Sequence, residues 1–177
     1  MTDPIARPEP QAVFLINHYM NGIIAGIMAG HAISRLHMAY PITHAATPLI
    51  EQWDKTPWFQ LLNGGFESHL EEAAQALEVI NRDLEANPHP ALPPGAQIPF
   101  CRFHEGQREL RGTLTAVAII LPGEFFLPRD EEDNLPADFA KLLKRSKRTR
   151  AATAIERTDL SVEYRVGLLF EHLGFAK

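Results

Sequence analysis

The sequence predicts an α+β fold dominated by helices, with an N-terminal helical bundle, a small antiparallel three-stranded meander and two C-terminal helices. Three observations lead to this expectation. Apolar residues recur at helical spacing up to residue 86 and again after residue 136. Prolines interrupt the chain over 87–99, and β-branched residues become frequent over 100–128. A length of 177 residues, 45% of them hydrophobic, suits a single domain covering 1–177.

The region 11–86 is expected to be helical, after a flexible arm at 1–10. An apolar stretch over 11–39 predicts one long helix or two abutting helices. Pro41 ends this stretch, because a proline disfavours helical geometry in the residue before it. The N-terminal part of the chain is therefore expected to form a helical bundle.

Two Thr-Pro pairs and an amphipathic pattern predict the other helices of this region. The pairs at 47–48 and 56–57 each resemble an N-cap followed by proline in the first helical position. We therefore expect short helices over 48–54 and 57–63. Apolar residues three and four positions apart predict a longer helix over 69–86. The opposite face of that helix is acidic, and we expect it to be solvated.

The second half of the chain begins with an extended connector over 87–99, because its prolines exclude helix. Strands are expected next over 100–104, 110–121 and 124–127, where turn residues separate runs of β-branched and aromatic residues. These strands would form the antiparallel meander of 100–128. A sheet this small must pack on helices to bury its apolar face.

Two helices are expected within 136–174. The first covers 136–155, and the second begins at Asp159 or Ser161. Gly174 ends the second helix, because glycine readily adopts the backbone conformation found just after a helix C-terminus. The apolar residues of this last helix share one face, so we expect it to pack on the rest of the domain.

Composition excludes several classes of protein. The hydrophobic content excludes wholesale disorder, and the single cysteine, Cys101, excludes an intrachain disulfide framework. With 17 Lys and Arg against 22 Asp and Glu, the formal net charge of −5 excludes a wholly basic nucleic-acid-binding protein. Polar residues interrupt the apolar run over 12–39, and its longest clean stretch, 22–30, is shorter than the roughly 20 residues that span a bilayer. We therefore expect a cytoplasmic protein without membrane insertion.

The clearest functional feature of the sequence is a reversal of charge around residue 140. Acidic residues dominate 124–138 and basic residues dominate 141–157. The basic side chains that form the proposed binding stripe are Lys141, Lys144, Arg145, Lys147, Arg148 and Arg150. Clustered Lys and Arg favour contact with phosphates, because each contact releases condensed counterions. The alternative is a solvated face that neutralises acidic residues of the same chain.

A second feature is a stripe of glycines four residues apart in the first predicted helix. Its members are Gly22, Gly26 and Gly30. Each glycine costs a helix roughly 1 kcal/mol relative to alanine, so the stripe indicates a compensating close approach by another helix. That helix is either internal, at 69–86 or 160–173, or the same helix of a second copy in a homodimer. A third interpretation is room for a flat ligand contacted by His18 and Asn21.

Eight histidines raise the question of a metal site or an enzyme. Two histidines of one helix can bind the same ion at a spacing of three or four, which the N-terminal histidines lack. Loop geometry leaves His37 and His44 as weak metal candidates. His104 and Glu105 are neighbours at the end of a predicted strand, where adjacent residues point to opposite faces. Cys101 is expected to be buried and unreactive, and no cofactor motif is present, so no cofactor is expected.

These features predict a small intracellular, non-enzymatic regulatory or adaptor protein. Its basic helix, 141–157, would contact an acidic partner, with nucleic acid as the first candidate and an acidic protein as the second. The alternative is an assembly or inhibitor subunit that uses the glycine-striped helix 12–39 or the acidic helix 69–86. A histidine-based enzyme that binds a metal or a ligand is the least favoured interpretation.

Overall fold

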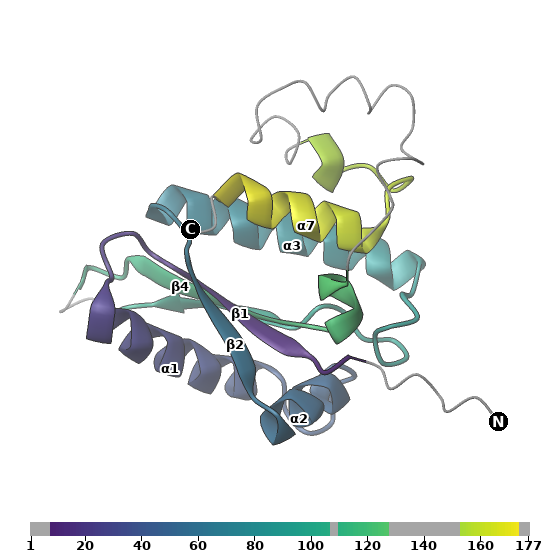
Figure 1. Ribbon diagram of the computed structural model, residues 1–177, viewed down its shortest axis with the longest axis horizontal. Coiled ribbons are helices and arrows are strands. Elements are labelled where there is room, and N and C mark those ends of the chain that lie inside the picture. The colour runs from purple at the N-terminus through teal and green to yellow at the C-terminus, as the bar shows by residue number, and fades with distance from the viewer. Residues whose placement is uncertain (1–7, 107–109, 128–152, 174–177) are drawn as a thin grey trace.

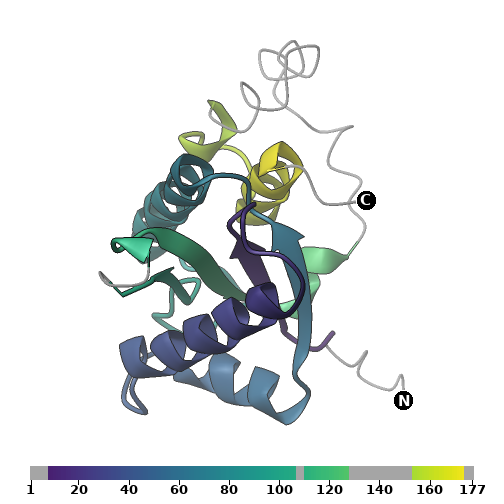
Figure 2. The same cartoon turned by 90° about the vertical axis from the view of Figure 1, so that its left-hand side faces the viewer.

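A mixed β-sheet lies between two layers of helices (Figure 1). The computed structural model describes residues 8–106, 110–127 and 153–173. On one side of the sheet lie α1 (Gly22–Ala39) and α2 (Thr47–Lys55). On the other side lie α3 (Glu67–Ala86) and α7 (Val162–Leu173), and Figure 2 shows the same three layers from a second direction. The fold is thus mixed α and β, as expected, but its strands are arranged differently.

The sheet has four strands in the order β2-β1-β4-β3. They are β1 (Gln11–Ile16), β2 (Trp58–Asn63), β3 (Phe100–His104) and β4 (Leu114–Leu121). β1 and β2 are parallel neighbours, whereas β4 runs antiparallel to both β1 and β3. Parallel strands need a crossover, and α1 and α2 provide it between β1 and β2.

The expected helix over 11–39 is wrong in its first part. Gln11–Ile16 forms a strand, and α1 starts only at Gly22. β1 lies between β2 and β4, and its residues from Ala12 to Ile16 are all buried. A strand covered on both faces is apolar throughout and loses the alternation that identifies strands, so its sequence resembles a buried helix.

The expected helix over 57–63 is also wrong, because these residues form β2. Thr56 does not begin a helix but ends α2, where its N–H donates to the carbonyl of Trp53. The following residues instead pair along β1, from Gln11 opposite Trp58 to Ile16 opposite Asn63. The region 11–86 is therefore not a helical bundle, and the aromatic residues of β2 follow strand preference.

The three-stranded meander is wrong in its arrangement. β3 and β4 form the antiparallel pair expected within 100–128. The third expected strand is absent, because Gly123–Phe126 forms a short 3-10 helix, η1. The free side of β4 pairs instead with β1, so one long-range strand pairing replaces a local one.

Several predicted elements are confirmed. Helices expected over 48–54 and 69–86 are present as α2 and α3, although Ala46 rather than Thr47 is the N-cap of α2. No helix occurs in the connector 87–99. The last helix is present as α7, and the hydroxyl of Ser161 accepts the N–H of Tyr164 at its start. Of the helix predicted over 136–155, the part from 136 to 152 lies outside the described residues.

The core is centred on the two middle strands. All eight residues of β4 are buried, and β1 lies beside it. α1 packs against β1, β3 and β4, while α3 packs against β3, β4 and α7. Among the helices within 8–106, 110–127 and 153–173, none has both the length and the apolarity needed to cross a bilayer.

Candidate functional site

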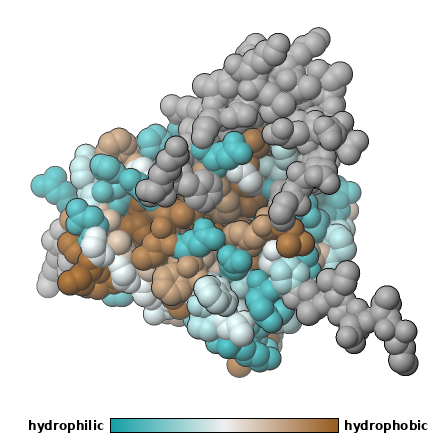
Figure 3. All heavy atoms as spheres, in the orientation of Figure 1, coloured by the Kyte–Doolittle hydropathy of each residue, from teal (hydrophilic) through white to brown (hydrophobic). Residues whose placement is uncertain are grey.

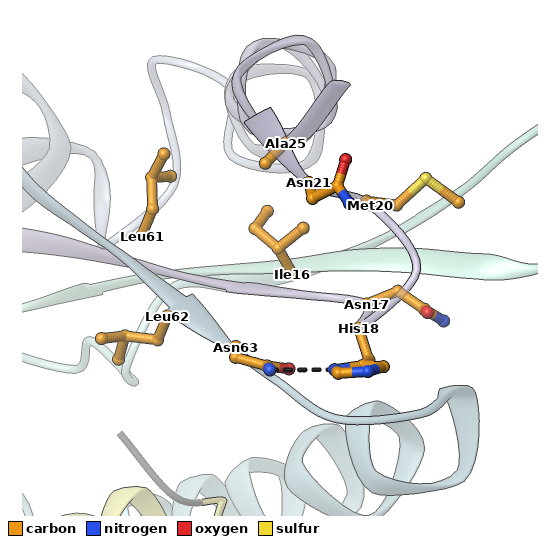
Figure 4. A pocket seen from close by; sticks show the side chains of 9 residues that line it. All are labelled: Ile16, Asn17, His18, Met20, Asn21, Ala25, Leu61, Leu62 and Asn63. Carbon is orange, nitrogen blue, oxygen red and sulfur yellow. Dashed lines mark hydrogen bonds between the residues drawn. The ribbon is translucent and has the colours of Figure 1, made fainter. Parts of the chain in front are cut away.

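A pocket lies where β1 and β2 end. These strands are parallel, so their carboxyl ends meet at the same edge of the sheet, and this is the usual position of ligand crevices in such sheets. The pocket has a volume of about 400 Å³ and lies between the loop that leads into α1 and the end of β2 (Figure 4). Its apolar wall includes Ile16, Ala25, Leu61 and Leu62, and its polar groups come from asparagine and histidine.

Asn17 fixes the loop that forms one side of the pocket. This side chain is buried, and its amide group donates to the carbonyl of Leu114 over 3.2 Å. Its carbonyl oxygen accepts the N–H of Tyr19 at 3.1 Å. Both ends of the side chain are therefore occupied, which makes Asn17 a structural anchor of the pocket.

Asn63 sets the orientation of the His18 ring. The N–H of Gly65 donates to Oδ1 of Asn63 at 2.9 Å, so Nδ2 of Asn63 faces Nδ1 of His18 at 3.0 Å (Figure 4). An amide nitrogen donates, and the histidine nitrogen that it contacts must accept. The neutral ring then carries its proton on Nε2. Within the described residues Nε2 has no hydrogen-bond partner, so it is an available donor.

Asn21 provides the second available polar group. It precedes α1 as the N-cap residue, yet its side chain makes no capping hydrogen bond. Its carboxamide is exposed and lines the pocket, with no hydrogen-bond partner in the part of the chain that the structure describes. A carboxamide offers one acceptor and two donor hydrogens. Asn21 can therefore bind a ligand through paired hydrogen bonds.

Two glycines hold the end of β2 in place. A Cβ atom on Gly64 would overlap the Leu70 side chain and approach Cβ of Leu15 to 3.1 Å. Gly65 has φ +76°, in the left-handed region that favours glycine. The helix expected over 57–63 would have ended here, whereas Asn63 is the last residue of β2 and the two glycines follow it. The signal that could have located the pocket is the placement of Asn17, His18 and Asn63 at the ends of apolar runs.

The pocket is electrically neutral in its lining. The nine residues that surround it include no Asp, Glu, Lys, Arg or Cys. A carboxylate or phosphate would find no positive charge there, and an ammonium group would find no negative one. The lining therefore favours an uncharged ligand with hydrogen-bonding groups and an apolar part.

The glycine stripe of α1 is open on the outer side of the helix. Within the part of the chain that the structure describes, a Cβ atom on Gly22, Gly26 or Gly30 would meet nothing within 4 Å. The internal partners expected for it, at 69–86 and 160–173, correspond to α3 and α7, which cover the opposite side of the sheet. The prediction of an internal partner helix is wrong, because the sheet separates α1 from α3 and α7. The seam between two copies of α1 stays a prediction.

The basic binding stripe lies outside the described residues. This applies to Lys141, Lys144, Arg145, Lys147, Arg148 and Arg150. Arg157, at the end of the predicted basic helix, is described and donates through Nε to Oδ1 of Asp159 at 2.6 Å. That hydrogen bond lowers the pKa of Asp159. Contact of the stripe with an acidic partner therefore remains a prediction.

The acidic face of α3 is only partly solvated, which corrects our expectation. Glu71 and Glu78 both bind the guanidinium of Arg102 on β3, at 3.2 and 2.7 Å. Asp83 binds the buried Arg165 of α7 at 2.6 Å. These carboxylates join α3 to its neighbours, so they are committed to the fold.

The histidines considered for a metal are not gathered in one place. His37 lies 3.5 Å from Asp54, while Nδ1 of His44 accepts the N–H of Ala46. Across 8–106, 110–127 and 153–173, no group of three or more His, Cys, Asp or Glu residues is placed to bind an ion. His104 and Glu105 also act separately, because His104 contacts the carbonyl of Gly112.

Cys101 has the environment of a structural cysteine. It is buried on β3, and its Sγ donates to the carbonyl of Ala32 at 3.1 Å. Burial raises the pKa of the thiol to about 11, because the apolar surroundings disfavour the thiolate. The thiolate is the reactive form, so this residue is not a nucleophile near neutral pH.

Comparisons with protein families, with curated proteins and with solved structures found no match to this chain.

Proposed function

We propose that this protein binds a small uncharged ligand in the pocket at the carboxyl ends of β1 and β2. The observation that carries the proposal is the unoccupied carboxamide of Asn21 beside a pocket of about 400 Å³. Sites for small ligands typically occupy about 300–1,000 Å³ and combine apolar walls with a few polar groups. The pocket has both features.

The polar groups favour a ligand with a hydrogen-bond donor and an acceptor side by side. The carboxamide of Asn21 can pair with such an edge through two hydrogen bonds, as asparagine does with adenine. Nε2 of His18 supplies a further donor. Both a primary amide and a nucleobase offer this chemistry, and Ile16 and Leu61 provide the wall for an attached apolar group.

The first prediction concerns Asn21 and compares the two ligand sources. We expect N-acetyl-leucinamide or adenosine to shift the side-chain amide signals of Asn21 and Asn63 in a ¹⁵N–¹H NMR titration. Asn21→Ala should weaken that binding by about tenfold, because it removes a hydrogen-bonded pair worth about 1–2 kcal/mol. Asn21→Asp preserves shape but loses the donor, so it should weaken binding as well.

Asn87→Ala is the matched control for this titration. Asn87 is an exposed asparagine at the other end of α3, about 30 Å from the end that adjoins the pocket, given 1.5 Å per helical residue. We expect the control to bind like the wild type. Absence of any shift at Asn21 and Asn63 with both probes would contradict the proposal, as would equal binding by the Asn21 variants.

A second proposed function is contact with an acidic partner through 141–157, in a regulatory or adaptor role. The charge of this segment in the sequence supports it, with nucleic acid as the first candidate. The two functions use different parts of the chain, so either can hold without the other.

A further inference from the structure

Among the described residues, the outer edge of β2 is an open strand edge. β2 pairs with β1 on one side, and no described residue pairs with its other side. Trp58, Phe59 and Leu61 are 70%, 56% and 42% exposed, and the strand contains no charged residue. Figure 3 shows hydrophobic residues gathered on the face of the molecule that carries β2 and the start of α1. Natural edge strands usually carry charges or proline to prevent pairing, and this one has neither within its bounds.

The backbone of β2 offers hydrogen bonds at this edge. The N–H of Gly64 donates to the carbonyl of Ile16 on β1. Backbone groups alternate in direction along a strand, so those of Leu62 and Gln60 also point to β1. The N–H and C=O groups of Phe59 and Leu61 therefore point outward. No hydrogen bond to them comes from elsewhere in the described residues.

We propose that a second copy of this chain pairs along β2, antiparallel and about a two-fold axis at Gln60. The pairing joins two sheets of four strands into one continuous sheet. It places Phe59 opposite Leu61 of the second copy, and Trp58 opposite Leu62 of the second copy. A two-fold interface uses the same surface of both subunits, so the strand must be complementary to itself.

The two faces of the strand select this register. Phe59 and Leu61 face the α1 layer, where the Phe59 ring contacts Phe14 at a centroid distance of 6.1 Å. Trp58, Gln60 and Leu62 face the α3 layer. Residues directly opposite each other in an antiparallel pair must share a face, and this requires the axis to pass through a residue. With the axis at Gln60, an aromatic ring meets a leucine on both faces, which is a favourable cross-strand pair.

Moving the axis to Leu61 gives poorer pairs. Phe59 would then lie opposite Asn63 of the second copy, and Trp58 opposite Gly64. Asn63 is already occupied by His18 and the N–H of Gly65. With the axis at Gln60, each Phe59–Leu61 pair can exchange both backbone hydrogen bonds, and the two Gln60 residues form the closely spaced pair between them.

The first experiment measures the mass of the full chain by light scattering over a range of concentrations. We expect a species of twice 19.8 kDa that dissociates on dilution. Gln60→Lys should weaken the dimer by about tenfold, because it sets two like charges opposite each other on the axis. Gln75→Lys, on the exposed side of α3, is the matched control and should leave the dimer unchanged. Circular dichroism confirms that each variant is folded.

The second experiment tests the register. Gln60→Cys places two thiols in a closely spaced pair with Cα atoms about 4.5 Å apart, within the range of a disulfide. We expect mild oxidation to link the two copies, whereas Gln75→Cys should stay unlinked. The native Cys101 is buried and does not compete. A wild type that is monomeric at all concentrations overturns the proposal, as does a dimer that Gln60→Lys leaves intact or that Gln60→Cys fails to link.

Discussion

Asn81 shows what a single polar side chain contributes to this fold. It is buried on α3, where its amide donates to the carbonyl of Ile98 and its carbonyl accepts the N–H of Ile98, both at 2.9 Å. These bonds tie the end of the proline-rich connector to α3 and satisfy backbone groups that β3 does not pair. The sequence indicated that 87–99 is not helical, but Asn81 resembled any polar residue of an amphipathic helix. Its burial depends on contact with Ile98, which lies 17 residues further along the chain.

At the same scale, the buried thiol of Cys101 leads us to predict that the free energy of unfolding falls at alkaline pH. Burial raises the pKa of the folded thiol from 9.0 to about 11. The folded state therefore holds a proton that the unfolded state releases, and the free energy of unfolding falls as pH rises through this window. Urea denaturation at about pH 8 and about pH 10.5 should show this fall, and Cys101→Ala should reduce its slope.

Tyr40→Phe is the companion variant for this measurement, because burial also raises the pKa of the Tyr40 hydroxyl. That hydroxyl bonds the backbone of Phe100, next to Cys101. We expect the two substitutions together to remove more of the pH dependence than either alone. An identical slope in the wild type and in Cys101→Ala would show that the thiol does not contribute.

At the scale of elements, α3 was predictable because one of its faces meets water. α3 has buried residues at helical spacing and an exposed opposite side, so its periodicity is visible in the sequence. β1 and β2 lacked such a signal for opposite reasons. β1 is buried on both faces, while β2 exposes large apolar residues on both. Without alternation of apolar and polar residues, neither could be separated from a short helix.

Binding of nucleic acid by the predicted basic helix at 141–157 can be tested directly. An electrophoretic mobility assay with duplex DNA and with RNA at low salt should show a shift that disappears as salt rises. Lys144→Glu combined with Arg148→Glu should abolish the shift, because each phosphate contact carries part of the salt-dependent affinity.

Arg82→Glu on α3 is a charge reversal outside the segment, and it should leave the mobility shift intact. No shift with the wild type at low salt would remove nucleic acid as the partner. A shift that both variants lose equally would indicate an effect of net charge without a defined surface.

For the molecule as a whole, the link between α3 and α7 joins the C-terminal helix to the rest of the fold. Arg165 of α7 is 1% exposed, and Nη1 donates to Asp83 at 2.6 Å. Its Nε donates to the carbonyl of Ile155. A buried guanidinium needs these partners, because an unpaired buried charge is strongly destabilising.

Asp83→Ala should therefore lower the free energy of unfolding by about 3 kcal/mol, because it leaves Arg165 buried without its counter-ion. Chemical denaturation followed by circular dichroism measures this change. Asp159→Asn, in the exposed pair with Arg157, is the control and should change the midpoint little. Equal small effects of both substitutions would contradict the structural role of the Asp83–Arg165 pair.

The sequence alone determined the local features of this protein: α2, α3 and α7, the helix-free connector, the strands at 100–104 and within 110–121, and the lack of a membrane-spanning length in the apolar run over 12–39. Each depends on periodicity, capping or proline within a few residues. The tertiary structure decided that β1 lies at the centre of a mixed sheet, and that Asn17, His18, Asn21 and Asn63 line one pocket. These outcomes depend on pairing between segments more than 40 residues apart, such as His18 with Asn63, and no local pattern encodes which strand becomes a neighbour.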